Sequence, residues 1–267
     1  MFKIIVCAKQ VPDTNEIKID PVTKTLIREG VPSILNHDDA NALEEALKIK
    51  DTLKGDAHIT VVTMGPPQAK DMLIECLAMG ADDAILASDR ALGGSDTWAT
   101  SNALSGAIKT VGDYDLIFAG RQAIDGDTAQ VGPQIAEKLN IPQVTYVEEF
   151  SLADDRKTIT VKRALEDGYE VIEIKTPCLL TAIKELNTPR FMTVAGIVDA
   201  LEKDIPTLGA KELKVNPDTE VGLLASPTNV FRSFTPMPKG KGVIVEGDSP
   251  KTLADNLLIG LKEKHII

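Results

Sequence analysis

Aromatic residues and basic charge are both scarce in this chain of 267 residues. Phe, Trp and Tyr make up 4% of the sequence, too few to build the stacking platforms that hold single-stranded nucleic acid. Acidic residues outnumber basic ones by 40 to 29, which gives a formal net charge of −11. This balance disfavours binding to duplex nucleic acid and to anionic membrane surfaces, because both depend on positive charge. We therefore expect no nucleic-acid partner.

Long hydrophobic runs and clustered cysteines are missing as well. The apolar run after Lys3 is too short for a signal peptide or a membrane-spanning helix. The three cysteines, Cys7, Cys76 and Cys178, are odd in number and widely spaced, which favours free thiols in a reducing cytoplasm. The three histidines are equally scattered, so no His/Cys cluster has metal-ligand spacing. We expect a cytoplasmic protein with no membrane insertion and no metal.

Short apolar segments alternate with amphipathic ones through the first 150 residues. The expected strands are 2–8, 58–64, 83–87 and 114–119, and the expected helices are 39–53, 67–79, 95–110 and 128–139. Strands that are apolar throughout and separated by helices indicate a parallel sheet covered on both faces. The sequence therefore predicts an α/β fold, a mostly parallel sheet flanked by helices as in Rossmann-like proteins that bind adenine nucleotides. In such sheets ligands bind at the carboxyl ends of the strands, where the strand order reverses.

The pattern changes after residue 150. Two alternating segments, 158–165 and 169–174, predict a β-hairpin, and 178–183 predicts a strand that returns to the main sheet. From residue 187 onward periodicity is weak until a last helix at about 250–264. Residues 1–190 carry 20 basic and 30 acidic groups, a net of −10, whereas the last 77 carry 9 and 10. We expect a nucleotide-binding α/β domain in 1–190 and a C-terminal extension in 191–267 that packs on a partner.

Two loops carry the clearest chemical signals. No Gly-x-Gly-x-x-Gly or phosphate-loop motif occurs, but Gly120–Gly132 follows a strand directly, and we expect the next helix to begin near Asp127 or Thr128. Backbone N–H groups at such a helix start can bind a phosphate, with Asp125 and Asp127 capping N–H groups or accepting from a ribose hydroxyl. The spacing alone fits an ordinary capped helix equally well.

The second loop, Gly93–Thr100, has a similar composition and also leads into an expected helix. Two such loops can direct their amides into one crevice and hold the two phosphates of a dinucleotide. The segments Val11–Thr14 and Asn36–Asp39 adjoin the first strand and can line the same crevice, although turn and N-cap chemistry explains them equally simply. Trp98 is more typical of a core residue than of a stacking surface.

Several motifs recur together, and in this order, in a known family. They are Ala8-Lys9, the Asn36 segment, Ala-Met-Gly-Ala-Asp at 78–82, the Gly120–Gly132 loop and Leu-Asn-x-Pro-Arg at 186–190. Over essentially its whole length the chain resembles the beta subunit of electron-transfer flavoprotein. The sequences Val-Pro-Asp-Thr, Gly-Gly-Ser-Asp-Thr-x-Ala-Thr and Asp-Gly-Asp-Thr-Ala-Gln-Val-Gly-Pro-Gln resemble the electron-bifurcating branch of that family, from which respiratory members usually depart.

The resemblance implies an obligate heterodimer with a flavin-bearing alpha subunit. In the bifurcating branch this subunit binds FAD and accepts hydride from NADH. The electrons are then divided between ferredoxin and the alpha-subunit FAD, which feeds an acyl-CoA-type dehydrogenase. In the respiratory alternative the crevice holds structural AMP, and single electrons pass from dehydrogenases. A second alternative is a stand-alone nucleotide-binding regulatory module similar to universal stress proteins.

The resemblance also implies roles for individual residues. The expected cofactor-binding residues are Ala8, Asn36, Asp39, Thr63, Met64, Gly65, Asp96, Thr97, Thr100, Arg121, Gln122, Ala123, Ile124, Asp125, Gly126, Asp127, Thr128, Ala129, Gln130, Val131 and Gly132. The expected partner-recognition residues are Leu186, Asn187, Pro189, Arg190 and Phe191. No residue is assigned a catalytic role of its own, and Arg121 is the candidate for tuning the flavin by its charge. The lysine run that follows the recognition segment in mitochondrial members is missing here, so the dehydrogenase partner is not identified.

Overall fold

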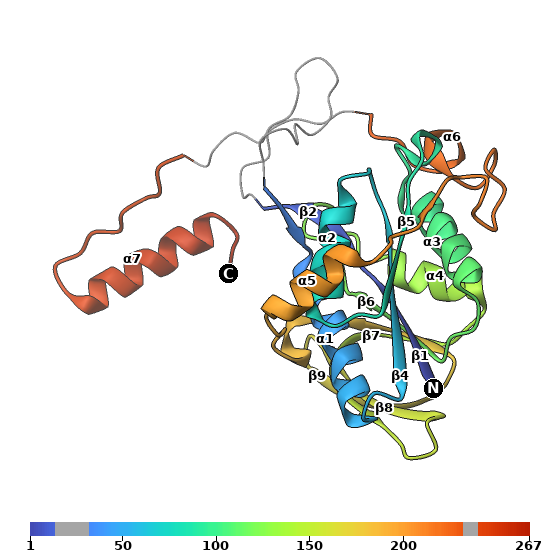
Figure 1. The fold of residues 1–267 in the computed structure, drawn as a ribbon. Coiled ribbons are helices and arrows are strands. Elements are labelled where there is room, and N and C mark those ends of the chain that lie inside the picture. The colour runs from blue at the N-terminus through green and yellow to red at the C-terminus, as the bar shows by residue number, and fades with distance from the viewer. Residues whose placement is uncertain (14–31, 232–239) are drawn as a thin grey trace. The chain divides into compact units, whose positions relative to one another are not determined.

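The computed structural model describes residues 1–13, 32–231 and 240–267, which belong to two compact units (Figure 1). The first unit contains residues 1–13 and 32–231, and the second contains residues 240–267. Thr14, the last residue of the expected crevice segment Val11–Thr14, lies outside the described residues.

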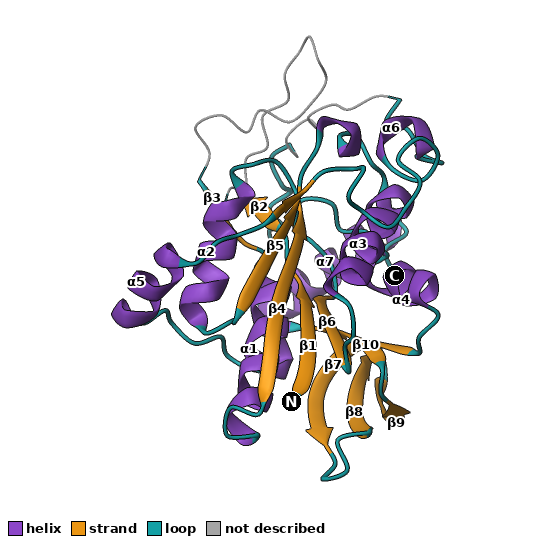
Figure 2. Ribbon diagram, turned by 45° about the vertical axis from the view of Figure 1, so that its right-hand side comes forward, coloured by secondary structure: helices purple, strands orange, loops and turns teal. Residues whose placement is uncertain are grey.

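The first unit is built on a nine-stranded, mostly parallel sheet, which confirms the predicted fold class (Figure 2). Its parallel strands are β1 (Phe2–Cys7), β4 (Ala57–Met64), β5 (Asp83–Ala87), β6 (Leu116–Gly120) and β10 (Cys178–Ala182). The antiparallel end is formed by β7 (Gln143–Leu152), β8 (Thr158–Leu165) and β9 (Gly168–Lys175), and β11 (Thr207–Leu208) pairs with β5. The strand order is β11-β5-β4-β1-β6-β10-β7-β8-β9.

Helices cover both faces of the parallel part of the sheet (Figure 2). One layer contains α1 (His37–Thr52) and α2 (Ala69–Met79), and the other contains α3 (Thr97–Val111) and α4 (Val131–Leu139). Alternate residues of β1 enter the two hydrophobic cores, Ile4 and Val6 on the α1 side and Ile5 and Cys7 on the α3 side. Because both faces are buried, these strands are apolar at nearly every position, which is the pattern that predicted them.

Shorter elements complete the first unit. They are β2 (Gln10–Pro12), β3 (Ser33–Leu35), η1 (Arg90–Leu92), η2 (Lys184–Leu186), α5 (Val194–Glu202) and α6 (Gly222–Ala225). All three cysteines are buried free thiols, as expected. Burial raises the pKa of the Cys7 thiol to about 12, so it is protonated at neutral pH.

Strand β7 and helix α5 are among the elements that the sequence did not predict, and the reasons are physical. Strand β7 pairs in parallel with β10 at its start and antiparallel with β8 at its end, and the register of both ladders shifts around Val147. Tyr146 there has a φ of 59°, so the strand carries no single periodicity. Helix α5 exposes the apolar side chains of Val194, Val198 and Leu201. Its sequence therefore lacks the separation into an apolar side and a polar side by which a surface helix is recognised.

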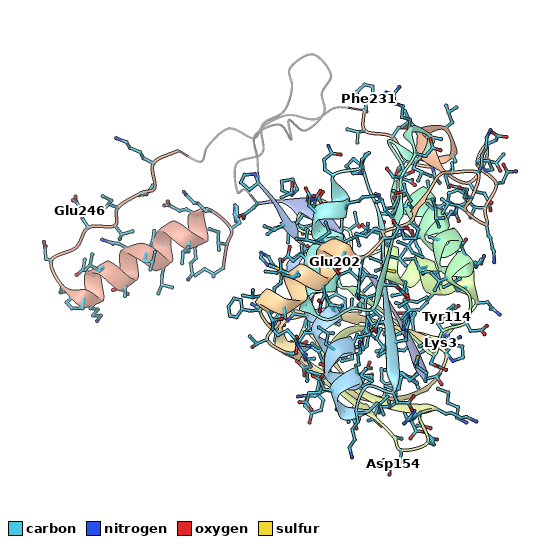
Figure 3. All side chains as sticks on the ribbon, in the orientation of Figure 1. Lys3, Tyr114, Asp154, Glu202, Phe231 and Glu246 are labelled. Carbon is cyan, nitrogen blue, oxygen red and sulfur yellow. The ribbon has the colours of Figure 1, made fainter. Side chains whose placement is uncertain are left out.

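Residues 191–231 belong to the same compact unit as the sheet. Helix α5 lies against α2 so closely that a Cβ on Gly196 would meet the carbonyl oxygen of Ala78. Ala210, Leu213 and Val221 enter the core on the α3 side. The expected division at residue 190 therefore does not coincide with the end of this unit at Phe231, which is labelled in Figure 3. How residues 191–267 contact a partner stays a prediction.

The second unit contains α7 (Pro250–Glu263), close to the predicted helix at 250–264. Ser249 begins it as a capping residue that accepts from the N–H of Thr252 (3.2 Å). Leu253, Leu257 and Leu258 leave much of their side chains exposed within the chain. No helix in the described ranges is long and apolar enough to span a membrane.

Candidate functional site

The strand order reverses between β1 and β6. After β1 the chain forms β4 and β5 on one side of it, and β6 then lies on the other side. Ligands of open α/β sheets bind outside the carboxyl ends of the strands at such a point. The residues there are Ala8 and Lys9 after β1, and Gly120 and Arg121 at the end of β6.

Asp39 joins these two strand ends. Its carboxylate accepts from the backbone N–H of Lys9 (2.8 Å) and from that of Gly120 (2.8 Å). The side chain is buried, and this burial raises its pKa to about 7 although the two N–H groups act in the opposite direction. A Cβ on Gly120 would meet the carboxylate and the backbone N of Asp39, so only glycine fits at this position. Asp39 thus fixes the crevice from the first turn of α1.

Three further contacts hold the beginning of the Gly120–Gly132 loop. The Asn36 amide donates to the carbonyl of Gln122 (2.9 Å) and accepts from the N–H of Ile124 (3.1 Å). Lys9 donates to Asp125 (2.6 Å), whose side chain is nearly buried. The sequence suggested turn and N-cap chemistry for Asn36, but its side chain makes no cap bond and instead connects α1 to this loop.

The expected start of the helix after this loop is wrong. Helix α4 begins at Val131, not near Asp127 or Thr128, because Asp127 and Ala129 adopt left-handed backbone conformations with φ of 48° and 52°. Such residues cannot continue a right-handed helix. Asp125 and Asp127 cap no backbone N–H of α4, since Asp125 pairs with Lys9 and Asp127 accepts from the Gln122 amide (2.8 Å).

The start of α4 therefore has no side-chain cap within the described residues. Its backbone N–H groups are the donors that a phosphate or pyrophosphate requires. Non-glycine residues with positive φ are uncommon, and they are often retained where a loop must present its backbone to a ligand. Gly132 at this end is buried against Thr181, where a Cβ would come within 2.7 Å of the Thr181 methyl carbon.

The second loop meets the first one. Thr97 Oγ1 donates to Gln130 Oε1 (2.9 Å), which connects the first turn of α3 to the residue before α4. Asp96 caps α3 by accepting from the N–H of Ala99 (3.0 Å), and its other oxygen accepts from the N–H (3.0 Å) and hydroxyl (2.8 Å) of Thr228. Burial raises the pKa of Asp96, but these hydrogen bonds outweigh it and leave the pKa below its usual value. The two predicted loops thus converge.

Trp98 is only partly buried, in contrast to the expected core position. The ammonium group of Lys138 lies 4.4 Å from the centroid of its indole ring, a cation–π arrangement. Thr100 follows within α3 and is also partly buried.

Two predicted site residues have a buried polar atom without a hydrogen-bond partner in the described residues, Thr63 Oγ1 and Arg121 Nε. A third such atom, Gln134 Oε1, belongs to α4, and a fourth, Arg163 Nε, belongs to β8. Thr63 and Met64 end β4, and the N–H of Gly65 donates to the carbonyl of Ala87 (3.1 Å). Buried polar groups are nearly always paired, so this set suits a polar ligand with both donors and acceptors. A nucleotide meets that requirement.

Arg121 has an acidic neighbour. Its Nε lies 3.4 Å from Asp38 Oδ2, and its guanidinium carbon is 5.7 Å from the centroid of the Tyr146 ring. Burial raises the pKa of Asp38, and Arg121 acts against that increase. The Arg121 side chain is about one-third exposed. No cluster of potential metal ligands occurs among the described residues.

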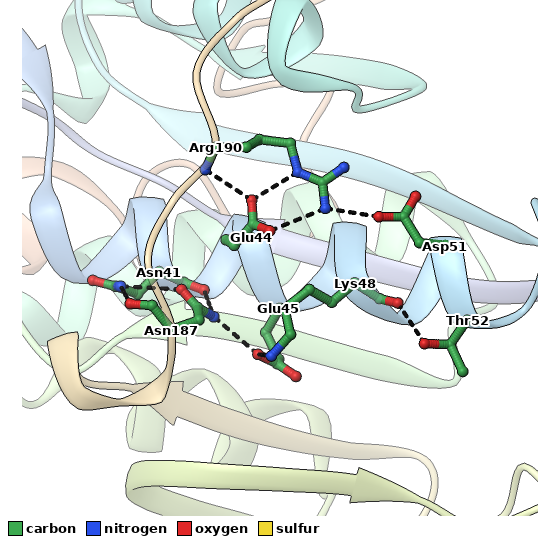
Figure 4. Close-up of polar contacts among 8 residues, drawn as sticks. All are labelled: Asn41, Glu44, Glu45, Lys48, Asp51, Thr52, Asn187 and Arg190. Atoms are coloured by element: carbon green, nitrogen blue, oxygen red, sulfur yellow. Dashed lines mark hydrogen bonds and ion pairs between the residues drawn. The ribbon is translucent and has the colours of Figure 1, made fainter.

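The predicted recognition segment is anchored to α1 at two points (Figure 4). Asn187 exchanges amide contacts with Asn41 (2.7 Å and 3.0 Å), and Arg190 forms a two-pronged pair with Glu44 (2.8 Å and 3.0 Å). Leu186 is buried, and Asn187, Pro189 and Arg190 are partly buried. Phe191, by contrast, is 95% exposed. Phe191 is the residue of the set with an apolar side chain directed to solvent.

The Gly120–Gly132 loop and the anchored segment both lie within a family match. A family model described as an electron transfer flavoprotein domain matches residues 23–213. The electron transfer flavoprotein subunit beta of Clostridium acetobutylicum is 57% identical over 267 residues, covering 100% of both chains. The chain belongs to the beta-subunit family of electron transfer flavoproteins.

Other relatives of this family are named as subunits of reductase complexes. The caffeyl-CoA reductase-Etf complex subunit CarD of Acetobacterium woodii is 61% identical over 266 residues, covering 100% of both chains. The acryloyl-CoA reductase electron transfer subunit gamma of Anaerotignum propionicum is 50% identical over 273 residues, again covering 100% of both. These matches confirm the family resemblance.

The sequence analysis did not identify several residues that contribute to the crevice or hold the recognition segment. Lys9 and Gln134 were not assigned to the site, and neither were the buried acids Glu44 and Glu45 of α1. One signal was available for the last two, because two adjacent glutamates interrupt an otherwise apolar stretch of helix at 42–47. The ligand contacts of the predicted site residues stay predictions.

Proposed function

We propose that this chain is the beta subunit of an electron-bifurcating flavoprotein complex. The complex would oxidise NADH to NAD⁺, deliver one electron to a low-potential acceptor such as ferredoxin, and deliver the other through the alpha-subunit FAD to an acyl-CoA-type dehydrogenase. The observation that carries the proposal is the contact between Thr97 and Gln130, which joins the starts of α3 and α4 at one crevice. The full-length similarity to CarD supports the bifurcating branch.

FAD, when bound by this subunit, would supply hydride acceptance and release of single electrons. The chain's own residues would bind and orient it. The uncapped N–H groups at the start of α4 and the loop before it would donate to the pyrophosphate. Asp39, Asn36 and Lys9 would keep that loop in position through the contacts described above.

The two buried side-chain oxygens of Thr63 and Gln134 would take part in binding. A threonine hydroxyl can donate and accept, and a glutamine carbonyl accepts, so the pair suits ribityl or ribose hydroxyl groups. Both belong to elements that reach the crevice, β4 and α4.

Arg121 would stabilise negative charge on a reduced flavin. A guanidinium near the flavin favours an anionic form through electrostatic attraction, and Asp38 at 3.4 Å moderates that effect. Replacing Arg121 with Ala should lower flavin affinity or shift its reduction by NADH.

The apolar surface around Phe191 would contact the dehydrogenase. The surface, here called the Phe191 surface, consists of exposed side chains on the segment before α5 and on α5 itself, namely Phe191, Met192, Val194, Val198 and Leu201. Large exposed apolar patches mark interaction sites. The apolar side of α7 would pack on the alpha subunit.

Purification with the neighbouring alpha subunit and extraction of the nucleotides tests the proposal. Two FAD per heterodimer and bleaching of the flavin absorbance by NADH are the expected results. One FAD plus one AMP, with no bleaching by NADH, would replace the proposal with the respiratory alternative. A stable monomer that binds ATP without an alpha subunit would favour the stand-alone module.

A further inference from the structure

Helix α1 contains two buried carboxylates that the crevice does not use. Glu44 and Glu45 are 6% and 4% exposed, although a carboxylate is rarely buried unless it is paired. Both point to the chain segment before α5, which is more than 140 residues away in sequence (Figure 4). Their partners show what these acids do.

Arg190 is bound to Glu44 by three hydrogen bonds. Its Nε donates to Oε2 (2.8 Å), its Nη2 donates to Oε1 (3.0 Å), and its backbone N–H also donates to Oε2 (3.0 Å). Nη2 reaches Asp51 as well (2.8 Å), and the hydrogen bonds to Glu44 and Asp51 raise the pKa of Arg190. The backbone contact matters most here, because it fixes the main chain and not only a side chain.

Asn187 provides a second anchor three residues earlier. Its Nδ2 donates to the carbonyl of Asn41 (3.0 Å) and to Glu45 (2.9 Å), while the Asn41 amide donates back to the carbonyl of Asn187 (2.7 Å). The main chain is therefore held at both ends of the segment 187–190.

The chain after Phe191 is fixed as well. Thr193 caps α5 by accepting from the N–H of Gly196 (2.9 Å), and α5 is packed against the end of α2. Only Phe191 and Met192 lie between the Arg190 anchor and this cap. Their apolar side chains are exposed while their backbone is bounded by fixed residues on both sides.

We propose that Glu44 and Arg190 are positioning residues for partner docking. They hold the backbone at Phe191 in its docking geometry before the partner arrives, so that binding requires less ordering of this segment. Neither residue needs to touch the partner. This inference rests on the proposed docking role of the Phe191 surface.

The test uses the full heterodimer and a purified acyl-CoA dehydrogenase as the probe. Steady-state electron transfer gives KM for the dehydrogenase and kcat for Arg190→Met, Arg190→Lys, Glu44→Gln and Phe191→Ala. Hydrogen exchange of the amides in 188–194, measured in the heterodimer alone, reports the order of the segment directly. Arg156→Met is the matched control, because Arg156 also pairs with a carboxylate (Asp56, 2.6 Å) at an exposed site outside α1 and the Phe191 surface.

Arg190→Met should raise KM about tenfold, because the bidentate pair and its fixed backbone contact are both lost. Glu44→Gln keeps the size of the side chain and should act in the same direction, and Arg190→Lys should recover part of the loss. Exchange in 188–194 should increase in each, while kcat at saturation, nucleotide content and the control variant stay unchanged.

Different results refute different statements. If Phe191→Ala raises KM but the Arg190 and Glu44 variants change neither KM nor exchange, the positioning role is wrong and the docking surface stands. If Phe191→Ala leaves KM unchanged, the docking role of the proposed function is wrong, and the positioning role falls with it. A joint loss of kcat, nucleotide content and thermal stability would show that Glu44 and Arg190 act only in folding.

Discussion

Replacing Asp39 with asparagine should change how the stability of this chain depends on pH. Burial raises the pKa of Asp39 from 3.8 to about 7 in the folded chain, whereas the unfolded chain titrates near the ordinary value. Between about pH 4 and pH 7 the folded state therefore binds more protons than the unfolded state. The contribution of Asp39 to the free energy of unfolding must therefore fall as the pH rises from about 4 to about 7, and it is constant above that range.

The size of the effect follows from the shift. A difference of about 3 pKa units corresponds to about 4 kcal/mol of stability lost on ionisation, of which about 3 kcal/mol falls between pH 5 and pH 8. In the Asp39→Asn variant the side-chain amide has only one oxygen for the two N–H groups of Lys9 and Gly120, and losing one of these bonds costs about 1–3 kcal/mol at either pH. Relative to the unchanged chain, Asp39→Asn should thus gain about 3 kcal/mol from pH 5 to pH 8.

Urea unfolding of the full chain at pH 5 and pH 8, followed by far-UV circular dichroism, measures this difference. Asp56→Asn is the control, because Asp56 is exposed and its pKa is lowered by its hydrogen bond from Arg156, so it does not titrate in this window. If the stability difference between Asp39→Asn and the unchanged chain is the same at both pH values, the buried carboxyl does not titrate near neutral pH and the reasoning is wrong.

Three further substitutions address the crevice. Thr63→Val should leave stability within about 1 kcal/mol, because the hydroxyl has no partner in the described residues, yet it should weaken nucleotide binding measured by calorimetry; unchanged affinity would remove Thr63 from the site. Gly120→Ala should lower the melting temperature and the nucleotide content of the purified heterodimer, since its Cβ would lie 2.7 Å from the backbone N of Asp39; normal values for both would contradict this steric argument. Asp96→Asn should destabilise the start of α3 by about 0.5–2 kcal/mol and increase hydrogen exchange around Thr228, whereas unchanged exchange there would show that the carboxylate does not hold that segment.

The parallel sheet could be predicted from sequence because its strands are buried on both faces. Runs such as Phe2–Cys7 and Ala57–Met64 are apolar at most positions, and the intervening helices have regular spacing. Strand β7 could not be predicted in the same way, since it changes partners and its backbone turns at Tyr146. Helix α5 was missed because its apolar residues Val194, Val198 and Leu201 lie on the surface and not in the core of this chain.

The sequence predicted that loops at the strand ends lie close together, but not how they are held. Contacts between Lys9 and Asp125 and between Gln10 and Gln68 join the loops after β1, β6 and β4, because parallel strands bring their carboxyl ends to one edge. The start of α4 was misplaced because local sequence does not reveal that Asp127 and Ala129 turn left-handed. The partner of Asp125 is Lys9, 116 residues away, and no local pattern predicts such a contact.

Helix α1 connects the crevice with the Phe191 surface. Its first turn holds Asp39 between the ends of β1 and β6, and five residues later Glu44 binds the backbone of Arg190. At 1.5 Å per residue these two positions are about 8 Å apart along the helix axis. One rigid helix would therefore fix the position of a partner bound at Phe191 relative to the crevice. The contacts at both ends depend on buried carboxylates of α1, Asp39 and Glu44. The acidic residues whose number first disfavoured nucleic-acid binding thus include Asp39 and Glu44, which hold the crevice and the backbone before Phe191 in place.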